Sequence, residues 1–97
     1  MSVRQAVREL VSAGTFPTED ASVEEIAETQ RLLECIEMPI SDEEAQLLLM
    51  AFGPDNCFGL AWTLLHLIES APSARTADYS KNAGNLWVQL LKDRRKI

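Results

Sequence analysis

The spacing of apolar positions along this chain predicts a fold built only from helices. Apolar side chains recur every three or four residues within 3–11, 23–36 and 86–91, which is the spacing of a helix with one buried face. The run 58–68 differs, because it is apolar on nearly every helical face and must therefore be surrounded by protein. It is too short to cross a membrane, which needs about 20 apolar residues. We expect an all-α, compact bundle of about five helices, with 58–68 as the central helix.

Start and stop signals divide the chain into helices. A serine followed three residues later by Glu or Gln forms a capping box, which satisfies free backbone N–H groups at a helix start; the pairs are Ser2–Gln5, Ser22–Glu25 and Ser41–Glu44. Gly14, Pro39 and the Gly53-Pro54 pair are placed to end the first three helices. We expect the second helix to reach about Glu37 and the third to span Asp42 to Phe52.

The second half of the chain is expected to contain two more helices. Asp55 is the expected N-cap of a fourth helix that runs to about Glu69 or Ser70, so the third and fourth helices would form a central αα-hairpin with a tight connection. Residues 71–78 are polar and rich in turn formers, which favours a mobile loop. The last helix is expected from about Asn82 to Arg95.

The helical spacing also predicts which side chains form the core. Phe16 is expected to fold back onto it, and Trp62 to lie inside it. The inward faces of the amphipathic helices are expected to hold Val3, Ala6, Val7, Leu10, Val11, Val23, Ile26, Ala27, Leu33, Ile36, Leu86, Trp87, Leu90 and Leu91.

Length and composition set the class of protein. Ninety-seven residues are enough for a single helical domain, 1–97, and an apolar share of 46% argues against disorder. The first residues lack the apolar region of a signal peptide, and Cys35 and Cys57 both lie on segments that read as buried, so we expect reduced thiols in a cytoplasmic protein.

Charge is distributed unevenly. The net charge is −6, and ten of the fifteen acidic residues lie between Glu19 and Glu44 with a single base, Arg31. From Arg75 onward there are six bases against two acids, and the bases near the end suit the last turn of a helix. Nucleic-acid binding usually needs a basic face, so the acidic total argues against a nucleic-acid partner.

No catalytic pair or metal site can be assembled from the sequence. Cys57 and His66 lie nine residues apart, which is about 13 Å along a helix and too far for proton transfer. His66 and Glu69 share a helix face, but a metal would need carboxylates from facing helices. A pairing of His66 with Cys35 across the fold stays open, although a lone histidine among leucines is typically a hydrogen-bonded interior residue. Asp55 and Asn56 read as capping and turn residues. We expect no enzyme, no metal and no cofactor.

The acidic stretch, 19–44, is the feature of the sequence that bears on function. Its carboxylates crowd two expected helices and their junction, and like charges on one face cost stability. The stretch is either a solvated surface or a docking surface whose field would steer a basic protein. Trp87 is either a core residue or a contact to the partner. The candidate binding residues are Glu24, Glu25, Glu28, Glu37, Asp42, Glu43 and Trp87.

The run 52–69, FGPDNCFGLAWTLLHLIE, resembles a segment of small all-helical proteins from actinomycetes, which also tend to carry an Asn-x-Trp-Val-like segment near their end. Here that segment is Asn85-Leu86-Trp87-Val88. The resemblance covers about the C-terminal two-thirds and implies no assigned activity. In size, acidity and helical content the chain is similar to bacterial immunity proteins that neutralise nuclease toxins, but it shares no motif with them.

Three hypotheses follow, and the leading one is a non-enzymatic, immunity- or antitoxin-like inhibitor whose acidic face covers a basic protein such as a toxin domain. The alternative is a structural or adaptor module that self-associates, as a homodimer for example, through Trp87, Leu91 and their neighbours. A small-molecule or metal-binding bundle around His66 and Trp62 ranks third.

Overall fold

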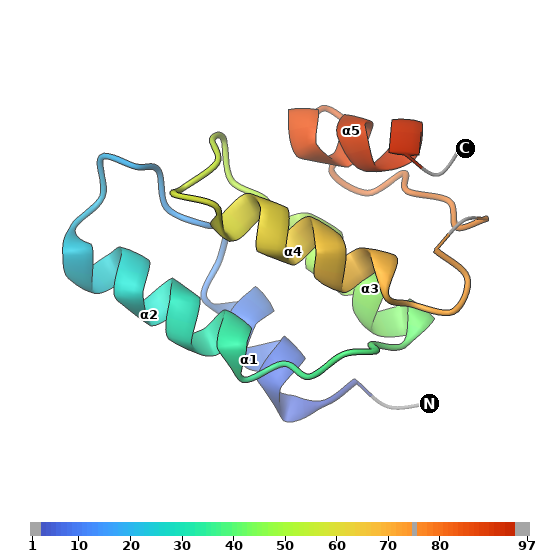
Figure 1. Ribbon diagram of the computed structural model, residues 1–97, viewed down its shortest axis with the longest axis horizontal. Coiled ribbons are helices and arrows are strands. Elements are labelled where there is room, and N and C mark those ends of the chain that lie inside the picture. The colour runs from blue at the N-terminus through green and yellow to red at the C-terminus, as the bar shows by residue number, and fades with distance from the viewer. Residues whose placement is uncertain (1–2, 75, 95–97) are drawn as a thin grey trace.

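The structure, a computed structural model, describes residues 3–74 and 76–94 and confirms an all-helical fold (Figure 1). Within these ranges there is no strand. The elements are α1 (Gln5–Ser12), α2 (Val23–Glu34), α3 (Asp42–Leu48), the 3-10 turn η1 (Leu49–Ala51), α4 (Leu60–Glu69) and α5 (Leu86–Arg94).

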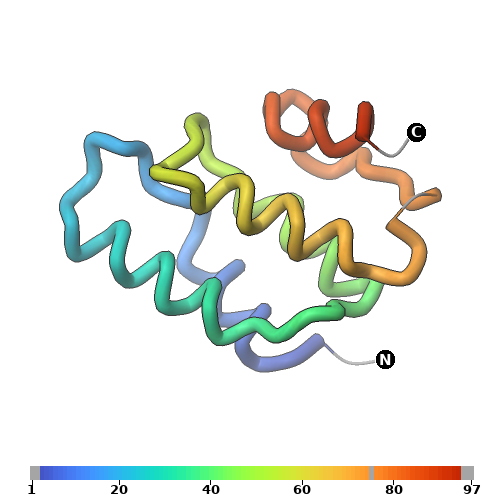
Figure 2. The backbone as a smooth tube through the Cα atoms, viewed as in Figure 1, coloured from blue at the N-terminus to red at the C-terminus, as the bar shows by residue number. Residues whose placement is uncertain are grey.

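Helix α4 lies at the centre of the bundle. It packs against α3 on one side and α5 on another, while α1 packs against α2, α3 and η1. The tube in Figure 2 shows α2 and the segment after it running along the opposite side of α4 from α5. The radius of gyration is 12.5 Å, the value expected for a compact chain of about this length.

The central helix is only partly enclosed. Six of its ten residues are buried: Leu60, Ala61, Leu64, Leu65, Leu67 and Ile68. The stripe formed by Trp62, Thr63 and His66 is exposed, so the expectation that protein surrounds this helix on all sides is wrong. Trp62 is 38% exposed rather than a core residue. The reason is tertiary, because the neighbouring helices leave one side of α4 open.

The capping signals are confirmed for two helices. The Ser22 hydroxyl accepts a hydrogen bond from the Glu25 N–H, and Ser41 and Glu44 form a complete capping box at α3. Helix α1 begins later than expected, with Arg4 at its N-cap; Ser2 lies outside the described residues.

Helix α4 also begins later than expected. Its N-cap is Gly59 and not Asp55, because Cys57, Phe58 and Gly59 all have positive φ angles (47°, 54° and 95°) that no right-handed helix contains. Helices α3 and α4 still pack together, but residues 52–59 connect them, so the connection is longer than the tight one predicted.

The connection also passes close to the segment after α1. Phe16 is buried and its N–H donates to the Ala51 carbonyl over 2.8 Å, which confirms that it folds back onto the core. A Cβ atom on Gly53 would lie 2.3 Å from the Phe16 carbonyl oxygen, so this contact requires glycine.

The two amphipathic helices at the edge of the fold bury fewer side chains than predicted. Helix α2 ends at Glu34 rather than near Glu37, and it buries Leu33, with Ile36 buried just beyond it. Val23 and Ala27 are exposed instead of inward, because no element covers the start of α2. Helix α5 begins at Leu86, which is itself exposed; Val88 and Leu91 are buried, and Trp87 and Leu90 are half-buried.

The described residues of 71–78, the segment predicted to be mobile, make several contacts. The Ser73 N–H donates to the Asp42 carboxylate over 3.0 Å, and the Gln46 side chain donates to the Asp78 carbonyl over 3.0 Å. The buried Tyr79 follows directly, and its hydroxyl donates to the Ala74 carbonyl. Ser73 and Asp78 therefore contact α3, and Arg75 lies outside the described residues.

Candidate functional site

Helix α2 brings three of the predicted binding residues to one groove. Glu24, Glu25 and Glu28 are exposed and, with Thr29, line a groove of about 390 Å³ between α2 and the segment 13–17. The Ser22 cap fixes where the helix begins and therefore which way these carboxylates point. The groove is an anionic surface that could receive lysine or arginine side chains.

The groove keeps most of its negative charge. Glu28 forms an ion pair with Arg31, one turn along the helix, and the Arg31 guanidinium lowers the pKa of the Glu28 carboxyl. Among the residues that the structure describes, no cation forms an ion pair with Glu24 or Glu25. Two carboxylates of the groove therefore face solvent without a basic neighbour.

The other predicted carboxylates lie elsewhere. Glu37 is exposed on the segment between α2 and α3, and Asp42 and Glu43 are exposed in the first turn of α3. Figure 1 shows the start of α2 and the start of α3 at opposite ends of the long axis, which measures 36 Å. The six predicted carboxylates therefore do not form one compact patch but are spread from the start of α2 to the start of α3, and we call this set of six the acidic edge.

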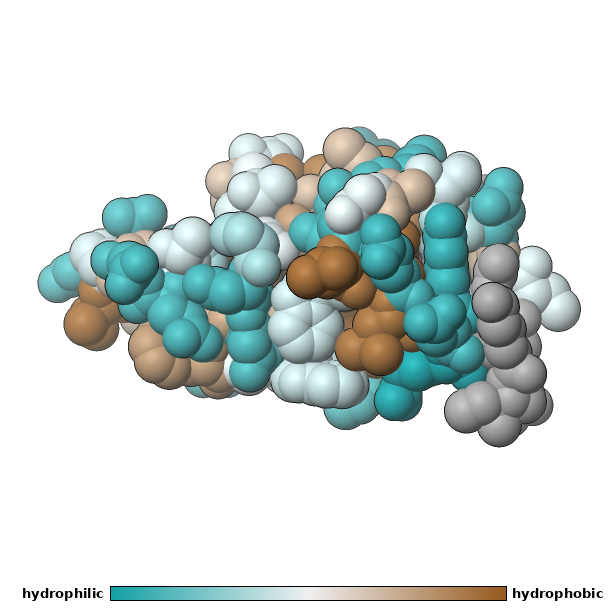
Figure 3. Space-filling model, turned by 90° about the horizontal axis from the view of Figure 1, so that it is seen from above, coloured by the Kyte–Doolittle hydropathy of each residue, from teal (hydrophilic) through white to brown (hydrophobic). Residues whose placement is uncertain are grey.

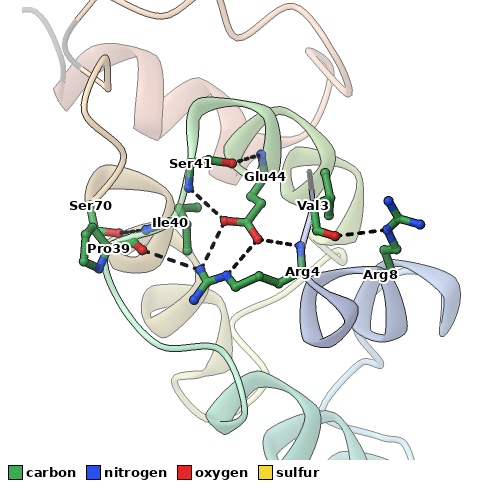
Figure 4. Close-up of polar contacts among 8 residues, drawn as sticks. All are labelled: Val3, Arg4, Arg8, Pro39, Ile40, Ser41, Glu44 and Ser70. Carbon is green, nitrogen blue, oxygen red and sulfur yellow. Dashed lines mark hydrogen bonds and ion pairs between the residues drawn. The ribbon is translucent and has the colours of Figure 1, made fainter. Parts of the chain in front are cut away.

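Glu44, in the same acidic stretch, has a different role (Figure 4). Its side chain is buried, 2% exposed, and its carboxylate accepts hydrogen bonds from the backbone N–H of Arg4, the Arg4 guanidinium and the Ser41 N–H. The Arg4 hydrogen bonds lower its pKa to about 2, against the opposing effect of burial. This carboxylate joins α1 to α3 and is not available to a partner.

Trp87 contributes to the packing of α5 on α4. Its ring stacks on Phe52, with centroids 6.4 Å apart, and meets the Trp62 ring edge to face at 5.3 Å. The Arg94 guanidinium lies 6.0 Å from the Trp62 ring and pairs with Glu69. Trp87 is half-buried, so the exposed aromatic surface here belongs mainly to Trp62.

The candidate chemical groups do not meet. His66, expected inside the protein, is exposed beside the Trp62 ring, and Cys35 is exposed at the end of α2. Cys57 is buried, and burial and the nearby Asp55 and Glu19 raise the pKa of its thiol rather than lower it. Within residues 3–74 and 76–94, no group of three or more His, Cys, Asp or Glu side chains could hold a metal ion.

Two exposed apolar residues near α2 were not anticipated. Val23 is 78% exposed and Phe58 is 69% exposed, although both were placed in helices that face the core. The signal in the sequence was Gly59, which permits a left-handed turn before α4 and so removes Phe58 from the helix.

Comparisons with protein-family models, with curated proteins and with solved structures found no match for this chain. Among the described residues, no helix is both long and apolar enough to span a bilayer.

Proposed function

We propose that this chain is a non-enzymatic protein-binding module, most concretely an immunity- or antitoxin-like inhibitor that covers a basic surface of its partner. The observation that carries the proposal is the α2 groove, where Glu24, Glu25 and Glu28 stand together on an exposed helix face. Glu24 and Glu25 have no basic neighbour among the described residues, and like charges held so close reduce the stability of the free protein. A cationic partner would relieve that repulsion.

In this mechanism the acidic edge acts in two steps. The carboxylates from the start of α2 to the start of α3 attract a cationic surface over distances of about a Debye length, roughly 8 Å at physiological salt. On contact, the α2 groove accepts basic side chains of the partner and excludes water and substrate from the surface it covers.

Self-association through Trp87 and Leu91 is supported less well. Leu91 is buried, and Trp87 stacks on Phe52 within the same chain, so neither side chain offers much free area to a second copy.

The proposal is tested by affinity capture from a lysate of the source organism, using the wild-type chain and the triple variant Glu24→Gln, Glu25→Gln, Glu28→Gln in parallel. We expect the wild type to retain a stoichiometric basic protein whose association rate falls steeply as salt is raised. The triple variant should associate about tenfold more slowly, because three of the steering charges are gone.

Two results would contradict the proposal. One is the absence of a stoichiometric partner, and the other is a partner that binds the triple variant as fast as the wild type. The matched control is Glu69→Gln, which removes one charge from the opposite part of the molecule, where Glu69 pairs with Arg94, and should leave the association rate within about twofold.

A further inference from the structure

A second groove lies on the other stripe of α2. Val23, Ile26, Ala27 and Gln30 follow the i, i+3, i+4, i+7 spacing of one helix face, and together with Phe58 they line a groove of about 320 Å³. We call it the Val23–Phe58 groove. Seen from above, apolar side chains show at the end of the molecule that contains the start of α2, with hydrophilic ones around them (Figure 3).

Phe58 is held at this groove by a braced turn. The Phe58 N–H donates to the Glu19 carboxylate over 3.2 Å, and the Asp55 carboxylate accepts from the N–H groups of Cys57 and Glu19. These hydrogen bonds hold the backbone of the turn, from which Phe58 lines the groove beside α2.

The position of Phe58 is unfavourable for the isolated protein in two ways. Its φ of 54° lies in a region that bulky residues rarely adopt, and 69% of its surface is in contact with water. Asparagine would suit the backbone better and would expose no ring. Residues in strained backbone conformations are concentrated at binding and active sites. Phe58 fits this description, because burial of its ring does not compensate for the strain.

The charges at the border of this groove are acidic. Glu19 and Asp55 brace the Phe58 turn, and Asp20 and Glu24 lie close to Val23 in the chain. The nearest base on α2 is Arg31, which is already paired with Glu28. An apolar floor inside a charged rim is the usual arrangement of a protein-binding hot spot.

We infer that the Val23–Phe58 groove binds one large apolar side chain of the partner, presented from a surface rich in lysine or arginine. This inference rests on the proposed function and names the anchor that the acidic edge alone does not provide. The acidic rim selects the occupant, because it repels an anionic lipid surface. It also repels a second copy, since a symmetric contact would place the same carboxylates against one another.

The test uses three peptides as probes against the full ¹⁵N-labelled chain. They are acetyl-KKLKK-amide, acetyl-KKAKK-amide and acetyl-EELEE-amide, and binding is followed by the backbone amide shifts of Val23, Ala27 and Phe58. We expect the Leu peptide to shift these amides and to bind about tenfold more tightly than the Ala peptide, the ratio expected for partial burial of a leucine side chain.

Two variants test whether Phe58 causes the difference in affinity between the Leu and Ala peptides. Phe58→Asn should remove the difference between the Leu and Ala peptides while leaving the affinity for the Ala peptide unchanged, because the acidic groups stay in place. Leu86→Gln is the control, since Leu86 is comparably exposed (73%) but lies at the start of α5. It should keep the tenfold difference.

Each of the other possible outcomes would overturn the inference, and each has a different meaning for the proposed function or for the occupant of the groove. Equal, salt-sensitive binding of both basic peptides would exclude an apolar anchor and leave the proposed function standing. Binding of the EELEE peptide as tight as that of KKLKK would exclude a basic partner at this groove. Failure of both basic peptides to bind would count against the proposed function as well. A wild-type dimer in sedimentation equilibrium that Phe58→Asn dissociates would make a second copy the occupant.

Discussion

Glu44 is the residue that joins the beginning of the chain to its middle. Its carboxylate accepts from the backbone and guanidinium of Arg4 at the start of α1 and closes the capping box with Ser41 at the start of α3. Arg4 also donates to the Pro39 carbonyl, so the same contact reaches the segment before α3. A single buried charge of this kind is stabilising only while it stays ionised and fully hydrogen-bonded.

We therefore predict that Glu44→Gln lowers the free energy of unfolding by about 2 kcal/mol at pH 7, since the Arg4 side chain is partly exposed and the pair is partly screened. The folded-state pKa of Glu44 is about 2, below its ordinary value of 4.5. Its contribution is present above pH 4.5 and is lost as the pH falls toward 2. Urea unfolding at several pH values measures this.

The control is Glu24→Gln, an exposed carboxylate on α2 that should change the free energy of unfolding by less than about 0.5 kcal/mol. Wild type and Glu44→Gln should converge in stability near pH 2. A constant difference between them from pH 7 to pH 2 would contradict the role of the charge.

At the scale of elements, Asn85 decides how α5 is attached. Its side-chain oxygen accepts from the Trp87 N–H over 2.8 Å, which caps the helix, and its amide nitrogen donates to the Gly53 carbonyl over 2.9 Å. The same nitrogen lies 3.4 Å from the carbonyl oxygen of Phe52, the residue on whose ring Trp87 stacks. One side chain thus starts α5 and ties it to the connection between η1 and α4.

Asn85→Ala should destabilise the protein by about 2 kcal/mol, because a helix cap and a hydrogen bond to a partly buried carbonyl are lost together. Trp87 would also become more exposed, so the tryptophan emission of the folded state should shift to longer wavelength. Urea unfolding followed by fluorescence measures both. Gln89→Ala on the same helix, where the side chain is exposed, should leave the emission unchanged; an equal shift in both variants would argue against a specific role of Asn85.

At the scale of the whole molecule, the distribution of charge matters more than its total. Ten acidic residues fall within 19–44, and of these Glu44 is buried with Arg4 and Glu28 is paired with Arg31. Most of the remainder is exposed and is spread along 19–43, so the free protein carries repulsion that salt can screen.

Raising NaCl from about 20 to about 200 mM should therefore raise the melting temperature by a few degrees at pH 7. The triple variant Glu24→Gln, Glu25→Gln, Glu28→Gln should show a smaller rise, since fewer like charges remain to be screened. Calorimetry with both proteins measures this. A melting temperature that falls with salt would mean that exposed ion pairs such as Arg94–Glu69 outweigh the repulsion.

The residues of the candidate site differ in how far the sequence could place them. The sequence put Glu24, Glu25 and Glu28 in one acidic stretch on the second helix, and in the structure they line one groove. Nothing in the sequence distinguished Glu44 from its neighbours as a buried residue, because its partner Arg4 is forty residues away. The exposure of Val23 also depends on which elements cover α2, and no local pattern reports that; for Phe58 the local signal was Gly59.

The sequence by itself determined the number and nature of the helices and the caps at Ser22 and Ser41, because helical spacing and capping depend on residues within one or two turns. Only the tertiary structure decided which faces are covered. It left the Trp62 stripe of α4 open, placed Ser73 and Asp78 against α3, and separated the carboxylates of α2 from those of α3. Burial depends on how separate helices pack against one another, and that packing is set by contacts between residues far apart in the chain.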